Sequence, residues 1–341
     1  MRRFLFVALT CAMSSASHVF GDLVGAERPQ AKVDAVLSVG IVVDDLDRSI
    51  DFYTRTLNFR VADVKEIVGD DAEALFGVFG MRARVATLSL GSEQIRLIDY
   101  LTPGGRPMPA DSRSNDRWFQ HIAIVVTDMD RAYARLREAK VGFASTGPQT
   151  LPLSNPNAGG IRAFYFRDPD NHVLELIQFP ADKGDPRWQR STELFAGIDH
   201  TAIVVTDTET SLRFYRDALG LRVAGESENV GTEQAHLNNV RGAHLRITGL
   251  RAVSGPGVEL LEYLAPQDGR PLPADPRLDD QSTWLTIVGS ADVEDLFRSL
   301  RDERQSFVSP TVVTAAGAGF GVSRAAIVRD PDGHAIAVSA P

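Results

Sequence analysis

Four side chains suited to metal binding or proton transfer stand on segments that have the composition of buried strands. His121 and His200 begin β-branched runs, Glu175 lies between two leucines, and Glu259 is followed by Leu260 and Leu261. A single histidine on a strand is more often structural, but an acidic side chain on an apolar strand is costly to bury without a partner. The importance of these four residues therefore depends on whether the fold brings them together.

The composition is that of a folded, water-soluble chain of about two domains. There are 341 residues, of which 43% are hydrophobic and 24% charged, and the net charge is −9. These values exclude a disordered chain, a collagen and a polytopic membrane protein. An acidic surface repels phosphate backbones, so nucleic acid is a poor candidate partner. The one cysteine, Cys11, permits neither an intramolecular disulfide nor a cysteine-based zinc site.

The N-terminus has the pattern of a secretory signal peptide. Arg2 and Arg3 precede an apolar run over residues 4–13, and small residues follow at 14–17. We predict a signal peptide over residues 1–21, a linker over 22–34, and export to the periplasm with no membrane segment left after cleavage. A misassigned start codon or a frayed terminus is the alternative. A lipoprotein at Cys11 is weaker still, because the preceding residues match the usual lipobox poorly.

A long internal repeat organises the rest of the chain. Ile41-Val42-Val43-Asp44-Asp45 recurs as Ile203-Val204-Val205-Thr206-Asp207, and Asp168-Pro169-Asp170 recurs as Asp330-Pro331-Asp332, both at an offset of 162 residues. The two halves are therefore homologous to each other.

Each half divides again into two units. In every unit a short β-branched segment is followed by an aspartate that can cap a helix, and two or three strand-like segments come after the helix. The expected strands are 38–43, 121–126, 200–205 and 285–288, and the expected caps are Asp45, Asp128, Asp207 and Asp292. We therefore predict an α+β fold of four βαβββ modules, at 35–103, 117–180, 196–266 and 282–341. They form two domains, 35–180 and 196–341, joined by a polar linker over 181–195.

These features together resemble the vicinal oxygen chelate superfamily. The resemblance rests on the strand ending Val-Val-x-Asp, the helix carrying Phe-Tyr (Phe52-Tyr53 and Phe214-Tyr215) and the closing Asp-Pro-Asp turn. The superfamily includes glyoxalase I, methylmalonyl-CoA epimerase, extradiol dioxygenases and bleomycin resistance proteins. It implies that paired modules curl into cup-shaped mixed sheets. Inside a cup, a divalent metal is held by one residue from the first strand and one from the last strand of each module.

Carried onto this chain, the resemblance implies one complete set of metal ligands. The first-strand positions are Ser38, His121, His200 and Leu285, and the last-strand positions are Arg96, Glu175, Glu259 and Ala337. Modules two and three thus keep ligands that modules one and four lack. If the two inner modules build one cup, His121, Glu175, His200 and Glu259 meet in a single site and the outer cup is metal-free. If modules pair one with two and three with four, each cup holds half a site. Glu262 is an alternative to Glu259, because a one-residue register slip reverses the face that a side chain occupies.

Two imidazoles and two carboxylates suit Zn, Ni, Co, Mn or Fe(II) rather than Cu(I). The set resembles that of bacterial glyoxalase I, and implies one divalent transition metal and a lyase, isomerase or epimerase that forms an enediolate from a small carbonyl substrate. Glu175 and Glu259 are the candidate catalytic bases. A ligand-binding protein without catalysis, like the bleomycin resistance proteins, and an extradiol dioxygenase are the alternatives. A monomer suffices, because both cups can form within one chain.

The other polar candidates are weaker. We interpret His172 and His334, which follow the Asp-Pro-Asp turns, as turn or surface residues. His236 and His244 could line the cup. Arg106 and Arg270, in twin Gly-Arg-Pro loops, could bind an anionic part of a substrate, although a role in the turn is favoured because both halves have them.

Overall fold

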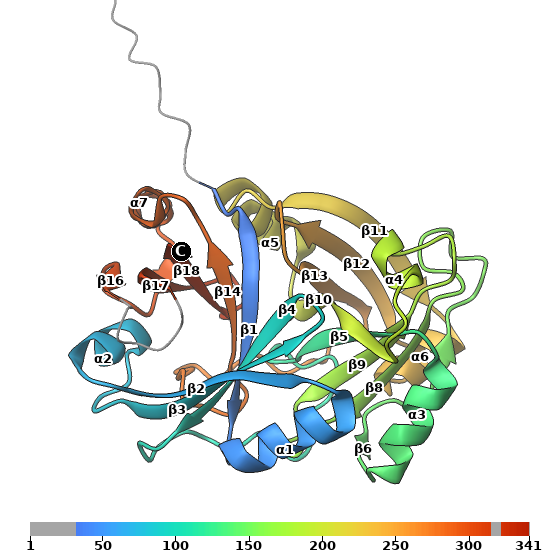
Figure 1. Cartoon of the computed structure of the whole chain (residues 1–341). Helices are drawn as coiled ribbons and strands as arrows, with labels where there is room; N and C mark the ends of the chain where they lie inside the picture. The colour runs from blue at the N-terminus through green and yellow to red at the C-terminus, as the bar shows by residue number, and fades with distance from the viewer. Residues whose placement is uncertain (1–31, 315–321, 341) are drawn as a thin grey trace, which may run out of the picture.

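The computed structural model describes residues 32–314 and 322–340, and they form two curved, open mixed sheets with helices packed against them (Figure 1). The predicted α+β fold of repeated modules is confirmed. The predicted signal peptide lies outside the described residues.

The four modules share one order of elements, in which a first strand, a helix and further strands follow one another. Module one contains β1 (Ala35–Val43), α1 (Leu46–Leu57), β2 (Arg60–Val68), α2 (Asp70–Phe76), β3 (Arg82–Leu90) and β4 (Glu93–Tyr100). Module two contains β5 (Gln120–Val126), α3 (Met129–Glu138), β6 (Gly142–Phe143), β7 (Gln149–Thr150), β8 (Arg162–Arg167) and β9 (Val173–Gln178). The linker between the halves carries the short helix α4 (Pro186–Gln189).

The second half repeats this order. Module three contains β10 (Phe195–Val205), α5 (Thr208–Leu212), the π-helical turn η1 (Arg213–Ala218), β11 (Arg222–Val230), α6 (Thr232–Asn238), β12 (His244–Arg251) and β13 (Gly257–Ala265). Module four contains β14 (Trp284–Gly289), α7 (Val293–Asp302), β15 (Ser306–Phe307), β16 (Val313–Thr314), β17 (Arg324–Arg329) and β18 (Ala335–Ala340).

Each sheet combines modules from opposite halves of the chain. The strand order β15-β17-β18-β14-β1-β4-β3-β2 joins modules four and one, and we call this the outer sheet. The order β11-β12-β13-β10-β5-β9-β8-β6 joins modules three and two, and we call this the inner sheet. In both, the first strands of two modules meet antiparallel at a central seam, β1 with β14 and β5 with β10. Modules two and three therefore build one cup together. Of the two pairings considered from the sequence, this is the one that predicts a single complete set of ligands.

Two of the hydrophobic clusters connect the modules in the other combination. One buried cluster joins β1 and α1 of module one to β5 and α3 of module two, with Tyr53, Leu57 and Leu136 fully buried in it. A second cluster joins modules three and four through the helices that follow β10 and β14. Two further clusters join module one to module four and module two to module three, as the sheets do. Removing either half of the chain would therefore expose apolar surface of the other.

The helices begin where the sequence predicts. The side chains of Asp45, Asp128, Asp207 and Asp292 each accept a hydrogen bond from the backbone N–H three residues later. Such caps satisfy one of the free N–H groups in the first turn. The first strand of each module therefore passes into its helix at a fixed residue, which keeps the strand register the same in every module.

The twin Gly-Arg-Pro loops form a reciprocal clasp between the halves. The Arg106 guanidinium donates to the Asp280 carboxylate, and the Arg270 guanidinium donates to that of Asp116, with Nε–Oδ1 distances of 2.9 and 3.1 Å. A Cβ atom on Gly269 would lie 1.8 Å from the Asn115 carbonyl oxygen, so this contact requires glycine. The arginines are therefore occupied by carboxylates of the opposite half, which supports the structural interpretation over the binding of an anionic substrate.

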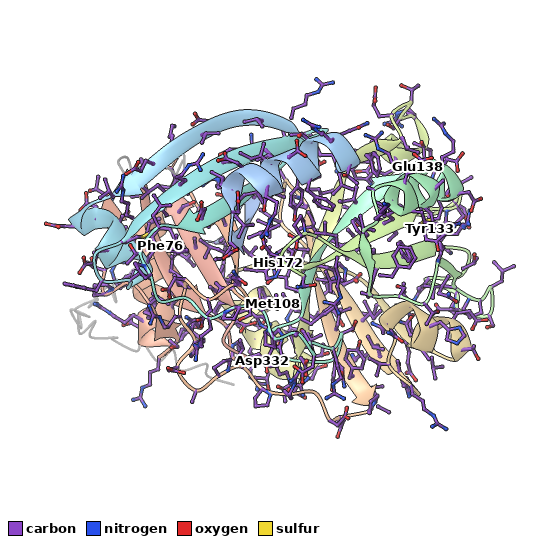
Figure 2. All side chains as sticks on the ribbon, turned by 90° about the horizontal axis from the view of Figure 1, so that it is seen from below. Phe76, Met108, Tyr133, Glu138, His172 and Asp332 are labelled. Carbon is purple, nitrogen blue, oxygen red and sulfur yellow. The ribbon has the colours of Figure 1, made fainter. Side chains whose placement is uncertain are left out.

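The histidines of the Asp-Pro-Asp turns are buried, so the expectation of surface residues was wrong while the turn role holds. His172 Nδ1 donates to Asp168 at 2.9 Å, and its Nε2 donates to the Gln281 carbonyl at 2.7 Å. His334 makes the same pair of bonds, to Asp330 and to the Arg117 carbonyl. His172 lies near the centre of the molecule (Figure 2). Because these polar atoms are already engaged in hydrogen bonds, this cluster serves the fold.

No helix among the described residues is long and apolar enough to cross a membrane.

Candidate metal centre

His121 and His200 lie beside each other at the seam of the inner sheet. β5 and β10 run antiparallel there, with His121 opposite Ala202 and His200 opposite Ala123. The two imidazole rings lie 5.9 Å apart between their centroids. The seam thus unites one histidine from each half of the chain.

The two glutamates reach the same place because all four modules share one register. The last strand runs parallel to the first, and the residue two after the first-strand position pairs with the last-strand position, as Ala123 does with Glu175 and Ala202 with Glu259. The corresponding pairs in the outer sheet are Gly40 with Arg96, and Ile287 with Ala337. The equivalence of the positions inferred from the sequence is therefore present in the strand pairing itself.

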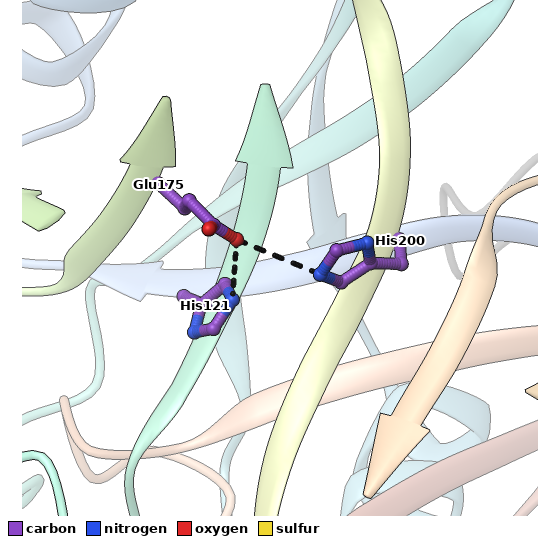
Figure 3. Close-up of side chains that lie close together, drawn as sticks. All are labelled: His121, Glu175 and His200. Carbon is purple, nitrogen blue, oxygen red and sulfur yellow. Dashed lines mark hydrogen bonds and ion pairs between the residues drawn. The ribbon is translucent and has the colours of Figure 1, made fainter. Parts of the chain in front are cut away.

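His121 and His200 converge on the Glu175 carboxylate (Figure 3). Glu175 Oε2 lies 3.1 Å from His121 Nε2 and 3.6 Å from His200 Nε2. Glu259 Oε2 lies 3.5 Å from the same His200 nitrogen. One donor atom each from His121, Glu175 and His200 all lie within 4.8 Å of one another. Glu259 therefore lies beside this trio, next to His200.

Glu262 belongs to the other face of its strand. Its carboxylate accepts a hydrogen bond from the Thr208 backbone N–H at 3.2 Å, at the start of α5. Glu259 lines the cavity on the concave face. The register of β13 on β10 therefore separates the two glutamates, and Glu259 is the one placed beside the histidines.

The site is buried, and the two carboxylates differ in environment. Burial tends to raise the pKa of Glu175, but its hydrogen bond with His121 and the attraction of the His121 and His200 rings outweigh this effect and hold the pKa below the ordinary value. Burial raises the pKa of Glu259, and the charge of Glu175 adds to the rise while His200 opposes it. Burial disfavours protonation of His200, yet Glu259, Asp199 and Glu175 together raise its pKa well above the ordinary value. The negative charge of the surrounding carboxylates therefore makes this a strong attractor of positive charge.

The donor set fits a divalent transition metal. Two imidazole nitrogens and two carboxylate groups are the ligand types that such ions prefer. His200 Nε2 is buried and has no hydrogen-bond partner among the described residues, although carboxylate oxygens of Glu175 and Glu259 lie 3.6 and 3.5 Å from it. A metal ion would satisfy that nitrogen and the facing oxygens together.

A cavity of about 450 Å³ opens beside the site, on the concave face of the inner sheet. Glu175, His200 and Glu259 line it, and His121 is not part of the lining. An adjoining hollow of about 290 Å³ shares part of the wall with it. The shared wall consists of Leu151, Asn157, Ser227, Asn229 and Gln234. His236 and His244 do not line the cavity, so the suggestion that they line the cup was wrong; His244 instead lies 2.6 Å from Glu228 near the surface.

The equivalent face of the outer sheet is filled. Ser38, Arg96, Leu285 and Ala337 occupy the matching positions, and they provide one hydroxyl, one guanidinium and two aliphatic side chains. The neighbouring hollow between the described residues measures about 10 Å³, with Phe76 and Ile327 in its wall. Burial lowers the pKa of Arg96 to about 10. This cup is therefore built as apolar core around a buried cation.

Several residues around the site were not found from the sequence. Asp199 contacts His200 Nδ1, and its position directly before His200 is the one signal that could have revealed it. Arg251 from β12 and Trp188 from α4 bond to Asp199. Tyr165 on β8 packs against His121 with 4.9 Å between ring centroids. The last three come from separate segments, so no spacing in the chain connects them with the histidines.

Known proteins match both halves of the chain. The model of the Glyoxalase/Bleomycin resistance protein/Dioxygenase superfamily matches residues 35–176 and again residues 197–338. A 2-epi-5-epi-valiolone epimerase from an Actinomyces species is 34% identical over 165 residues, which cover 47% of this chain and 86% of the epimerase. A lactoylglutathione lyase of Arabidopsis thaliana is 26% identical over 202 residues, which cover 59% of this chain and 60% of the plant protein.

Solved structures show the same arrangement of the whole chain. Glyoxalase I from Zea mays aligns with a TM-score of 0.57 at 16% identity, covering 91% of this chain and 92% of the maize protein. At this identity the likeness establishes the fold alone. The relatives found by sequence thus include lyases and an epimerase, and the match spans three fifths of the plant lyase.

Proposed function

Because the chain belongs to the glyoxalase/bleomycin resistance protein/dioxygenase superfamily, we propose that it is a metal-dependent lyase, isomerase or epimerase of the glyoxalase I type. Its reaction would move a proton at the carbon next to a carbonyl group of a small substrate. The observation that carries this proposal is the convergence of two imidazoles and two carboxylates at the wall of an open cavity.

The proposed ligands are His121, Glu175, His200 and Glu259. A divalent transition metal held by them would act as a Lewis acid toward oxygen atoms of the substrate, which stabilises developing negative charge by several kcal/mol. The strands that carry the ligands are central in the sheet, so the ligands are held by a rigid scaffold.

The two carboxylates suit different tasks. Glu175 contacts both imidazoles, and its side chain is only 6% exposed, so it is fixed in place. Glu259 contacts only His200 within the site, and its side chain is 26% exposed toward the cavity. We assign Glu259 as the base that takes the proton from the substrate, and Glu175 as the anchor that holds the two imidazoles in register.

The cavity favours a small molecule with both apolar and polar groups. Ile161, Phe179 and Ile247 provide apolar wall, and Asn157, Asn229 and Gln234 provide amides. The epimerase relative makes 2-epi-5-epi-valiolone a reasonable first substrate to test, and the lyase relatives make hemithioacetals of glutathione the second. We also propose that the protein is exported, on the N-terminal pattern alone. Export would separate the protein from glutathione adducts made in the cytosol. We therefore favour 2-epi-5-epi-valiolone over the hemithioacetals as the substrate to test first.

The test combines metal content with proton exchange. Purified protein should carry about one transition metal per chain, measured by mass spectrometry of the elements. It should also introduce deuterium from D₂O next to the carbonyl of a substrate drawn from hemithioacetals, 2-oxo acids, acyl-CoA thioesters and 2-epi-5-epi-valiolone. A chain that binds such compounds with no metal and no exchange would be a binding protein, and the enzymatic proposal would be withdrawn.

A further inference from the structure

The surroundings of His200 differ from those of His121, and this difference points to a residue outside the ligand set. We propose that Asp199 is a positioning residue that fixes the orientation and tautomer of His200, so that Nε2 is presented to the metal. This inference rests on the proposed metal site described above.

Asp199 is held by donors on both carboxylate oxygens. Its Oδ2 accepts hydrogen bonds from His200 Nδ1 at 3.0 Å and from Arg251 Nη2 at 2.8 Å. Its Oδ1 accepts from Trp188 Nε1 at 3.1 Å. Arg251 Nη1 also donates to the Asp199 carbonyl at 2.8 Å. The Asp199 side chain is 8% exposed, so these bonds are shielded from competing water.

The bond from His200 to Asp199 decides which ring nitrogen can bind a metal. An ionised carboxylate can only accept, so the proton must sit on Nδ1 of the imidazole. In the neutral imidazole that a metal requires, Nε2 then carries the lone pair. This is the nitrogen that lies near Glu175 and Glu259. A histidine ligand whose other nitrogen donates to a carboxylate is fixed in orientation and is a more basic donor.

His121 lacks such a partner. Its Nε2 faces Glu175, but its Nδ1 is buried with no hydrogen-bond partner among the described residues. The rings of Phe119 and Tyr165 pack beside it, with centroids 5.5 and 4.9 Å away. The two imidazoles are therefore unequal, and His200 is the ligand whose geometry depends on a charged neighbour.

The support for Asp199 extends into the linker and the outer sheet. Trp188 belongs to α4, and the Arg187 guanidinium lies 3.8 Å above its ring. Arg187 Nη1 pairs with Glu93 Oε1 at 2.7 Å, at the start of β4. Glu93 Oε2 accepts from the Ile198 backbone N–H at 3.1 Å, two residues before His200. The outer sheet, which lacks the ligand set, thus helps to position the metal site of the inner sheet.

The experiment measures Co²⁺ binding to the full chain by competition with a chelating dye, together with the visible absorption of bound Co²⁺. Asp199→Asn keeps the size of the side chain but replaces one acceptor oxygen with an amide N–H group, which cannot accept a hydrogen bond from the neighbouring donors. Co²⁺ affinity should therefore fall by about 10–100-fold. Trp188→Phe removes a single donor and should weaken binding less, in the same direction. The absorption bands should shift in Asp199→Asn, because the orientation of one nitrogen ligand changes.

The chain offers a matched control in Asp330→Asn. Asp330 accepts from His334 Nδ1 at 2.9 Å in a buried pair of the same chemistry, outside the ligand cluster. This variant should unfold at a lower temperature but bind Co²⁺ as tightly as the unmodified protein. Equal loss of affinity in both variants, or Co²⁺ affinity of folded Asp199→Asn within twofold of the unmodified protein, would overturn the role of Asp199. Failure of the unmodified chain to bind Co²⁺ would overturn the metal site itself, and this inference with it.

Discussion

Replacing Glu259 by glutamine separates proton transfer from metal binding. Glu259→Gln keeps the volume of the side chain but removes the proton acceptor that faces the cavity. A positioned base contributes about 10²–10⁴-fold to such a reaction, which corresponds to about 3–5 kcal/mol in the barrier. His121, Glu175 and His200 remain within 4.8 Å of one another, so the metal should still be held. We therefore expect metal-loaded protein that exchanges the substrate proton at least a hundredfold more slowly.

The assay is the uptake of deuterium from D₂O by proton NMR, with metal content measured on the same sample. Glu175→Gln should behave differently, because this carboxylate contacts both imidazoles and its loss should release the metal. Glu262→Gln is the matched control on the same strand: it bonds to Thr208 on the opposite face and should leave both quantities unchanged. Metal-loaded Glu259→Gln with an exchange rate within threefold of the unmodified protein would refute the assignment of the base.

Three further predictions concern stability. Arg270→Ala removes the guanidinium that pairs with the buried Asp116 carboxylate, so the free energy of unfolding in urea should fall by about 2–3 kcal/mol. A loss below 1 kcal/mol would contradict the stabilising role of the clasp between the halves. Co²⁺ at a hundred times its Kd should raise the free energy of unfolding by about 2.7 kcal/mol, and a chelator should reverse this gain. Co²⁺ should not stabilise Glu175→Gln, and an equal gain in that variant would contradict the metal site. Burial disfavours the charged forms of Asp330 and His334, but their mutual attraction outweighs it, lowering the pKa of Asp330 below 3.8 and raising that of His334 above 6.5. The pair therefore stabilises most between about pH 4 and 6.5, and less as the pH rises through the raised histidine pKa. The stability lost in His334→Asn should accordingly be larger at pH 6 than at pH 9, and an equal loss at both would show that the charge pair contributes nothing.

The sequence predicted the modules because their signals are local. The capping aspartates and the β-branched runs each span only a few residues, and they recur in the second half at an offset of 162 residues. Every expected cap forms. The residue types proposed as ligands were also visible, since an acidic residue on an apolar strand is exceptional. Other features depended on contacts that no local pattern encodes. The burial of His172 is decided by a carbonyl more than a hundred residues away, and the pairing of Arg270 by an aspartate of the other half.

By itself, the sequence determined four strand–helix units and placed the imidazoles and carboxylates on the first and last strands of the middle two. It left two pairings of the modules open, and it left Glu262 as an alternative to Glu259. Only the tertiary structure decided these points, because hydrogen bonds at the seam between β5 and β10 join segments whose composition would suit either neighbour. That seam, and the register of β13 along β10, bring four side chains from two halves of the chain to one cavity.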